Sequence, residues 1–208
     1  MTAGATRIGE LTLADWRREV SELYARVRAS DDPRAAWELW RRTRDRLFGE
    51  HPQSPLDAAG RATFAGLPYH RYDPGARVTA DVVPAAAAEL ELETSTGPPY
   101  RFRRVGLARF ALAGDDLELP LYWLKGYGGG LFLPFADGTS GRTTYGAGRY
   151  LIDTVKGADL GTAGGRLVLD FNFAYNPSCA YDPRWACPLP PPANRLPVEV
   201  RAGERAPV

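Results

Sequence analysis

Lysine, histidine, cysteine and methionine are all scarce in this chain of 208 residues. Only Lys125 and Lys156 are lysines, so arginine supplies nearly all of the 26 basic groups, against 25 acidic ones. The net charge is +1, and basic and acidic residues interleave without a block of either sign. Proteins that bind DNA or RNA carry a clustered basic surface, so we expect no nucleic-acid partner.

Long apolar runs are also absent. No segment approaches the roughly 18 consecutive apolar residues of a membrane span, which predicts no membrane partner. The first residues, MTAGATRIGEL, lack the apolar stretch of a secretory signal, so a cytoplasmic location is expected. A chain of this length can bury a core without disulfides or metals. We expect no metal and no cofactor, and the sequence indicates no oligomeric state.

Two amphipathic helices are expected in residues 1–50, which we predict to pack on the rest of the chain. The first is predicted to begin at Thr12. The second is predicted to begin with Asp32 as its N-cap and Pro33 in its first turn, and to end at Gly49. Apolar residues recur at spacings of three and four in both: Trp16, Val20, Leu23 and Val27, then Trp37, Trp40, Leu47 and Phe48.

Residues 51–208 are predicted to form a β-rich domain, because the apolar pattern changes there to a period of two. Gly114-Asp115-Asp116 separates two alternating runs and predicts a hairpin turn. The fold class expected is α+β, with the helical pair on a mostly antiparallel, barrel-like or sandwich sheet of about eight or nine strands. The runs include residues 78–82, 90–94, 117–123, 131–135, 149–152, 166–175 and 196–200.

The run RLVLDFNFAY at 166–175 has one continuous apolar face and a second face that carries Asp170 and Asn172. If another layer covers that second face, an acid and an amide lie side by side in the interior. A buried carboxylate needs a partner. We expect Arg149 to be the partner of Asp170, with Arg142 as the second candidate.

Two glycine-rich segments, GYGGG at 126–130 and YGAGR at 145–149, do not match a phosphate-binding loop and are predicted to be turns. The segment DGTSGRTTYG at 137–146 concentrates hydrogen-bonding side chains. It is either a turn whose Asp and Thr side chains bind their own backbone or one wall of a site.

Cys179 and Cys187 are separated by seven residues, which is not the CxxC spacing of a zinc knuckle or a thioredoxin site. Two small buried thiols are the favoured interpretation. A disulfide across the loop and a nucleophilic cysteine remain open. The proline-rich run at 188–192 predicts an extended course, so that residues 175–192 form a stiff cover over the domain.

The segments FLPFADGTSGRTTYGAGRYL and DFNFAYNPSCAYDPRWACPLPPPANRLPVEVRAGE resemble the DUF1684 family of prokaryotic proteins without assigned function. SPL at 54–56 and FAGLPYHRYDP at 64–74 are similar to its upstream part, and the likeness runs from about Trp37 to Glu204. The resemblance implies no activity. Its motif contains both cysteines but not His70, which speaks against a Cys–His mechanism.

The clustered polar groups predict one pocket that binds a small polar or carboxylated molecule, with Arg149 as the anion partner. A hydrolytic or acid/base enzyme is an alternative, with Asp170 as base and Tyr145 or Cys179 assisting. A third alternative is that the polar motif only stabilises the fold. The residues expected to bind ligand are Asp137, Thr139, Thr144, Tyr145, Arg149, Asp170, Asn172, Tyr175 and Asn176.

Overall fold

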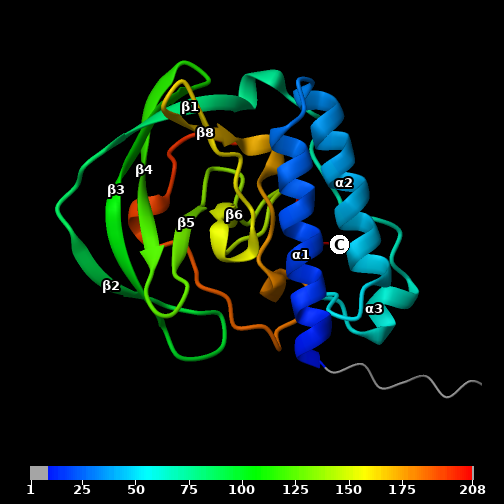
Figure 1. Ribbon diagram of the computed structural model, residues 1–208. Coiled ribbons are helices and arrows are strands. Elements are labelled where there is room, and N and C mark those ends of the chain that lie inside the picture. The colour runs from blue at the N-terminus through cyan, green and yellow to red at the C-terminus, as the bar shows by residue number, and fades with distance from the viewer. Residues whose placement is uncertain (1–8, 208) are drawn as a thin grey trace, which may run out of the picture.

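A computed structural model describes residues 9–207. Two long helices lie side by side against one side of a curled sheet (Figure 1). The helices are α1 (Gly9–Arg28), α2 (Pro33–Glu50) and the short α3 (Ala58–Ala62). The strands are β1 (Arg77–Val83), β2 (Ala88–Leu92), β3 (Tyr100–Leu112), β4 (Asp115–Leu124), β5 (Gly130–Phe135), β6 (Arg149–Asp153), β7 (Thr162–Ala163) and β8 (Arg166–Asp170).

The eight strands form one antiparallel sheet in the order β6-β5-β4-β3-β1-β8-β7, with β2 also paired to β3. The long strand β3 is shared: its first residues pair with β2 and its later ones with β1. This sheet curls into a half-barrel, which confirms the predicted α+β class and the expected strand number.

The start of α2 is as predicted. The Asp32 carboxylate accepts hydrogen bonds from the amides of Arg34 and Ala35, and Pro33 is the first helical residue. Two other predicted helix ends were wrong. Thr12 lies inside α1, where its hydroxyl donates to the Gly9 carbonyl, and Gly49 lies inside α2, which ends at Glu50.

The predicted hairpin joins β3 to β4, one residue earlier than the sequence indicated. Ala113 and Gly114 form the turn with φ of 56° and 93°, and Asp115 already pairs with Leu112. Two consecutive left-handed residues are the conformation that favours a tight hairpin with the sheet's right-handed twist. The pairing shifts register once, between Arg104 and Gly106.

Strand β4 separates two apolar cores. Leu117, Leu119 and Leu121 contact the first core, whereas Tyr122 and Leu124 contact the second. Because side chains alternate along a strand, the two cores lie on opposite faces of β4. The first core includes residues of the C-terminal segment, such as Leu196 and Val200, and the second includes part of each predicted helix stripe, such as Leu23 of α1 and Trp40 of α2. The helical pair therefore packs on the sheet as expected.

The strand predicted at 166–175 ends early. β8 stops at Asp170, whose carboxylate accepts the Asn172 amide and begins a 3-10 turn at residues 171–173. The predicted single apolar face is therefore divided, since Phe171 enters the first core and Phe173 the second. The predicted strand at 196–200 was also wrong: within residues 9–207 it joins no ladder, and Pro197 lacks the amide that a ladder needs.

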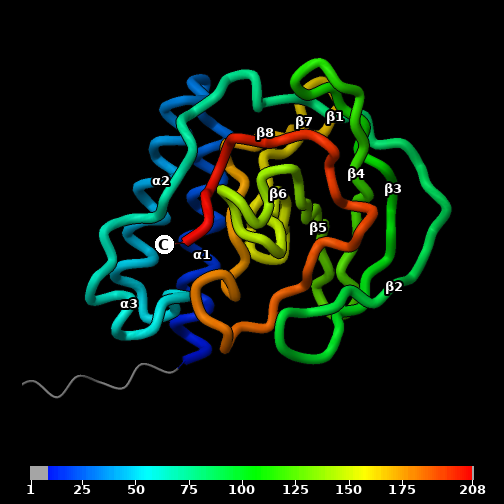
Figure 2. Tube along the Cα trace, turned by 180° about the vertical axis from the view of Figure 1, so that it is seen from behind, coloured from blue at the N-terminus to red at the C-terminus, as the bar shows by residue number. Residues whose placement is uncertain are grey.

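The C-terminal segment, orange to red in Figure 2, runs along the sheet and ends beside α2. Gly203 allows its close approach to the 171–173 turn. Its φ is +76°, and a Cβ there would lie 2.5 Å from the Ala174 carbonyl oxygen and 2.7 Å from that of Phe171. Among the helices in residues 9–207, none combines the length and apolar character needed to cross a membrane.

Gly203→Ala is expected to lower the free energy of unfolding by roughly 2–5 kcal/mol, because it adds a clash to a left-handed backbone. Gly164 is the matched control. Its φ is +57°, but a Cβ there would meet no atom within 4 Å. Gly164→Ala is expected to cost only roughly 1–2 kcal/mol. Urea denaturation measures both, and equal losses in the two variants would contradict the close approach.

Candidate functional site

Arg149, the first residue of β6, is completely buried and connects three segments. Its Nη2 donates to the Asp137 carboxylate at 2.8 Å and to the Val200 carbonyl at 3.0 Å. Its Nη1 donates to the carbonyls of Ala202 and, at 3.2 Å, Glu204. The charge of Arg149 is thus neutralised inside the protein and faces no solvent.

The 137–146 loop folds around the same ion pair. Asp137 Oδ1 accepts hydrogen bonds from the amide and the hydroxyl of Thr139 at 2.7 and 2.6 Å. The hydroxyls of Thr139 and Thr144 lie 2.8 Å apart. The structure therefore brings Asp137, Thr139, Thr144 and Arg149 together as expected. The loop residues surround the guanidinium of Arg149 itself.

Asp170 forms a second, separate cluster. One carboxylate oxygen accepts the amide and the side-chain nitrogen of Asn172 at 3.0 and 2.8 Å, and the other accepts Arg77 Nη1 at 3.1 Å. The predicted partners Arg149 and Arg142 were both wrong. Arg142 pairs with Glu199 instead, and Arg77 lies opposite Asp170 because β1 and β8 pair in that register.

The environment of Asp170 does not suit a general base. The residue is fully buried and both of its oxygens are engaged with the partners above. Burial raises the pKa of Asp170, and the hydrogen bonds from Asn172 and Arg77 oppose that rise. A base must reach the proton that it removes, and neither cavity described below includes Asp170.

A third cluster surrounds Glu204, which sequence reasoning missed. This buried carboxylate accepts hydrogen bonds from Arg44 Nε at 2.9 Å, from the Asn176 amide at 2.7 Å and from the Tyr181 hydroxyl at 2.9 Å. No local pattern in the sequence marks Glu204, because its partners come from α2 and from the 176–181 segment. Seven of the nine predicted residues are therefore divided among three internal networks, and Tyr145 and Tyr175 lie outside them.

A cavity of about 510 Å³ lies elsewhere, between α1, the sheet face that carries Phe102, Leu124 and Phe132, and the proline-rich 175–188 segment. The volume lies within the roughly 300–1,000 Å³ of ligand pockets. Aromatic and aliphatic side chains form most of its wall. They include Leu13, Trp16, Val20, Tyr24, Phe48, Tyr100, Phe102, Leu124, Phe132, Val155, Tyr175 and Trp185.

Two of the predicted residues, Tyr175 and Asn176, line this cavity with unsatisfied atoms. In the part of the chain that the structure describes, the Tyr175 hydroxyl and Asn176 Oδ1 are buried without a hydrogen-bond partner. Nearly all buried polar atoms in proteins have a partner. Both residues line the cavity, and these two atoms have no partner among the described residues.

The cavity also contains a cation that the sequence did not single out. Lys156 lies 3.3 Å from the Asp153 carboxylate, and its side chain remains 43% exposed while that of Asp153 is 9% exposed. Burial lowers the pKa of Lys156, but several interactions, of which the charge of Asp153 is the largest, together raise it more, so the net direction is upward. The ammonium is therefore charged at neutral pH and accessible from the cavity.

Cys187 lies at the cavity, and both cysteines are free within residues 9–207. Cys187 is buried and lines the wall, whereas Cys179 is half-buried and lies 3.8 Å from the Tyr145 hydroxyl. The interaction between the two thiols lowers the pKa of Cys179 and raises the pKa of Cys187. Burial raises the pKa of Tyr145 to about 12, so its hydroxyl stays protonated at neutral pH.

Sequence reasoning also missed a group of possible metal ligands, Asp15, Glu19 and His51. The atoms that could bind a metal lie within 4.8 Å of one another. Each already has a charged or polar neighbour: Glu19 pairs with Arg46, and His51 Nε2 lies 3.7 Å from the Asp15 carboxylate. These contacts join α1 to α2 and to His51, which directly follows α2. We interpret the group as part of the packing between the two helices.

A family model described as "Protein of unknown function (DUF1684)" matches residues 62–205. The chain belongs to the DUF1684 family. Among solved structures, this DUF1684 protein is similar to the uncharacterized protein from gene locus rrnAC0354 of Haloarcula marismortui, determined by solution NMR. The two are 38% identical with a TM-score of 0.60, over 82% of this chain and 92% of the other. No curated protein matches this chain.

Asp137→Asn is expected to destabilise the DUF1684 protein by roughly 3–5 kcal/mol, because it leaves the buried guanidinium of Arg149 without a counter-ion. Arg142→Gln is the control. Arg142 lies in the same loop but is exposed and pairs only at the surface, so its unfolding midpoint should equal that of the wild type. Urea denaturation at pH 7 measures both. A wild-type midpoint for Asp137→Asn would contradict the internal role of this ion pair.

Proposed function

We propose that this protein binds a small amphipathic molecule with a carboxylate head in the cavity between α1 and the sheet. The observation that carries the proposal is the accessible ammonium of Lys156 in a largely apolar cavity, which Tyr175 and Asn176, each with one unsatisfied polar atom, also line. Sites for small molecules combine apolar walls with a few convergent polar groups, and this cavity has that composition.

The apolar wall supports an apolar body for the ligand. Trp16, Phe102, Leu124 and Phe132 present rings and aliphatic groups from two sides of the cavity. Each Å² of apolar surface that leaves water contributes about 25 cal/mol. A chain or ring that fills this space therefore supplies most of the binding free energy, and the polar groups set its orientation.

The polar end supports a carboxylate. The Lys156 ammonium and the Tyr175 hydroxyl are donors, and Asn176 Oδ1 accepts a hydrogen bond from a hydroxyl or amide next to the carboxylate. An unsatisfied buried polar atom costs about 1–3 kcal/mol, so a ligand that satisfies these atoms recovers that free energy. Lys156 thus takes the role of anion partner that the sequence had assigned to Arg149.

The enzyme alternative has less support. Asp170 has no free oxygen, and the Tyr145 hydroxyl is protonated at neutral pH because burial raises its pKa to about 12. The structural alternative is supported for the network around Arg149, and it is compatible with ligand binding at a different place. Two free thiols suit a reducing compartment, which is consistent with a cytoplasmic location.

The test uses the only two lysines of the chain as a matched pair. Linear carboxylates from hexanoate to dodecanoate, and the alcohols of equal length, are titrated into wild type, Lys156→Gln and Lys125→Gln. Lys125 is a suitable control because it also pairs with a carboxylate, that of Glu89, but lies outside the cavity. Isothermal titration calorimetry gives the affinities.

Lys156→Gln is expected to weaken the best carboxylate at least about tenfold, since a hydrogen bond to a charged group contributes about 1.5–3 kcal/mol. Its affinity for the matching alcohol should be unchanged, and Lys125→Gln should bind both ligands as the wild type does. Failure of every carboxylate to bind the wild type, or equal losses in the two lysine variants, would contradict the proposal.

A further inference from the structure

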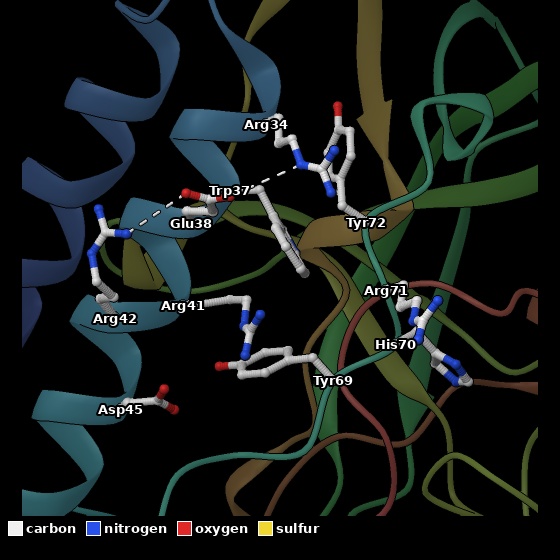
Figure 3. Close-up of a pocket in the computed structure, with 10 residues that line it drawn as sticks. All are labelled: Arg34, Trp37, Glu38, Arg41, Arg42, Asp45, Tyr69, His70, Arg71 and Tyr72. Carbon is white, nitrogen blue, oxygen red and sulfur yellow. Dashed lines mark ion pairs between the residues drawn. The ribbon is translucent and has the colours of Figure 1, made fainter.

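A second hollow, of about 660 Å³, lies between α2 and the extended segment at residues 69–72 (Figure 3). It shares no lining residue with the cavity of Lys156. Its walls carry four arginines, Arg34, Arg41, Arg42 and Arg71, and two carboxylates, Glu38 and Asp45, which leaves a balance of +2. Positive charge that gathers in a concave surface attracts anions.

Arg41 is held in this groove by aromatic rings rather than by a carboxylate. Its guanidinium carbon lies 4.7 Å from the ring centre of Trp37 and 4.6 Å from that of Tyr69 (Figure 3). Trp37 is itself fixed, because it is buried and its indole nitrogen donates to the Asn172 carbonyl at 3.0 Å. Stacking on these rings orients the guanidinium plane before any anion binds.

The hydrogen-bonding capacity of Arg41 is unused. Within residues 9–207 it forms no ion pair, and its buried Nε has no hydrogen-bond partner. Neither carboxylate of the groove pairs with Arg41. Glu38 lies 3.9 Å from both Arg34 and Arg42, and Asp45 accepts the Leu67 amide at 3.0 Å. No acceptor of the described residues therefore occupies the donors of Arg41 at the wall of this groove.

We propose that this groove binds a phosphate group, with Arg41 as its bidentate partner. A guanidinium donates two parallel hydrogen bonds to phosphate oxygens, which a point charge cannot do. The double charge of a phosphate monoester matches the balance of the groove, whereas a carboxylate neutralises only half of it. The phosphate is either free or carried by an organic molecule.

The test follows the arginine Nε–H signals by ¹H–¹⁵N NMR while inorganic phosphate or phenyl phosphate is added to the full chain. The Arg41 signal is identified by its loss in Arg41→Lys, which keeps the charge but not the two parallel donors. Arg109→Lys is the control, because Arg109 is exposed on β3, pairs with Glu118 and lies outside the groove. Urea denaturation checks that both variants are folded under the conditions used.

The Arg41 signal is expected to shift with saturation at a Kd of about 1 mM or tighter. Arg41→Lys should weaken binding about tenfold or more, and Arg109→Lys should not change it. Tighter binding of phenyl phosphate than of inorganic phosphate supports an organic phosphate, and equal binding supports the free ion. An Arg41 signal that does not respond to either compound, or equal affinity in Arg41→Lys, would overturn the proposal. This outcome is independent of the Lys156 cavity.

Discussion

The guanidinium of Arg149 holds together parts of the chain that no regular hydrogen-bond ladder connects. It pairs with Asp137 in the 137–146 loop and donates to carbonyls of the C-terminal segment, Val200, Ala202 and Glu204. A buried charge is tolerated only when it is paired and hydrogen-bonded, so the position of each of these segments is constrained by the others. The side chain of Glu204, placed in this way, then receives Arg44 of α2 and the Asn176 amide.

This arrangement separates the scaffold from the candidate sites. The clusters around Arg149, Asp170 and Glu204 satisfy their own charges and fix the loops, the sheet edge and the C-terminal segment. The candidate sites lie elsewhere, and residues with unsatisfied atoms line both of them: Tyr175 and Asn176 in the cavity that Lys156 also lines, and Arg41 in the groove beside α2. Because the Glu204 cluster anchors the backbone of Asn176, the scaffold also positions the polar end of the cavity.

The sequence predicted those features that local chemistry determines. Asp32-Pro33 marked the start of α2, and period-two patterns gave the α+β class and the strand number. It did not predict the partner of Asp170, because the register of β1 on β8 places Arg77 there from 93 positions away. Lys156 carries no motif and becomes significant only when α1 and the 175–188 segment enclose it. Tyr175 and Asn176 were predicted for the site, but for a pocket shared with Arg149 that the structure does not form.

The most direct test of the Lys156 cavity uses the unmodified sequence. Reductive ¹³C-dimethylation preserves the positive charge of lysine and yields side-chain NMR signals from Lys125 and Lys156 alone. Titration with the linear carboxylates is predicted to shift the Lys156 signal with saturation while the Lys125 signal stays in place, because only Lys156 lines the cavity. A Lys156 signal that does not move, or equal shifts at both lysines, would contradict ligand binding in this cavity.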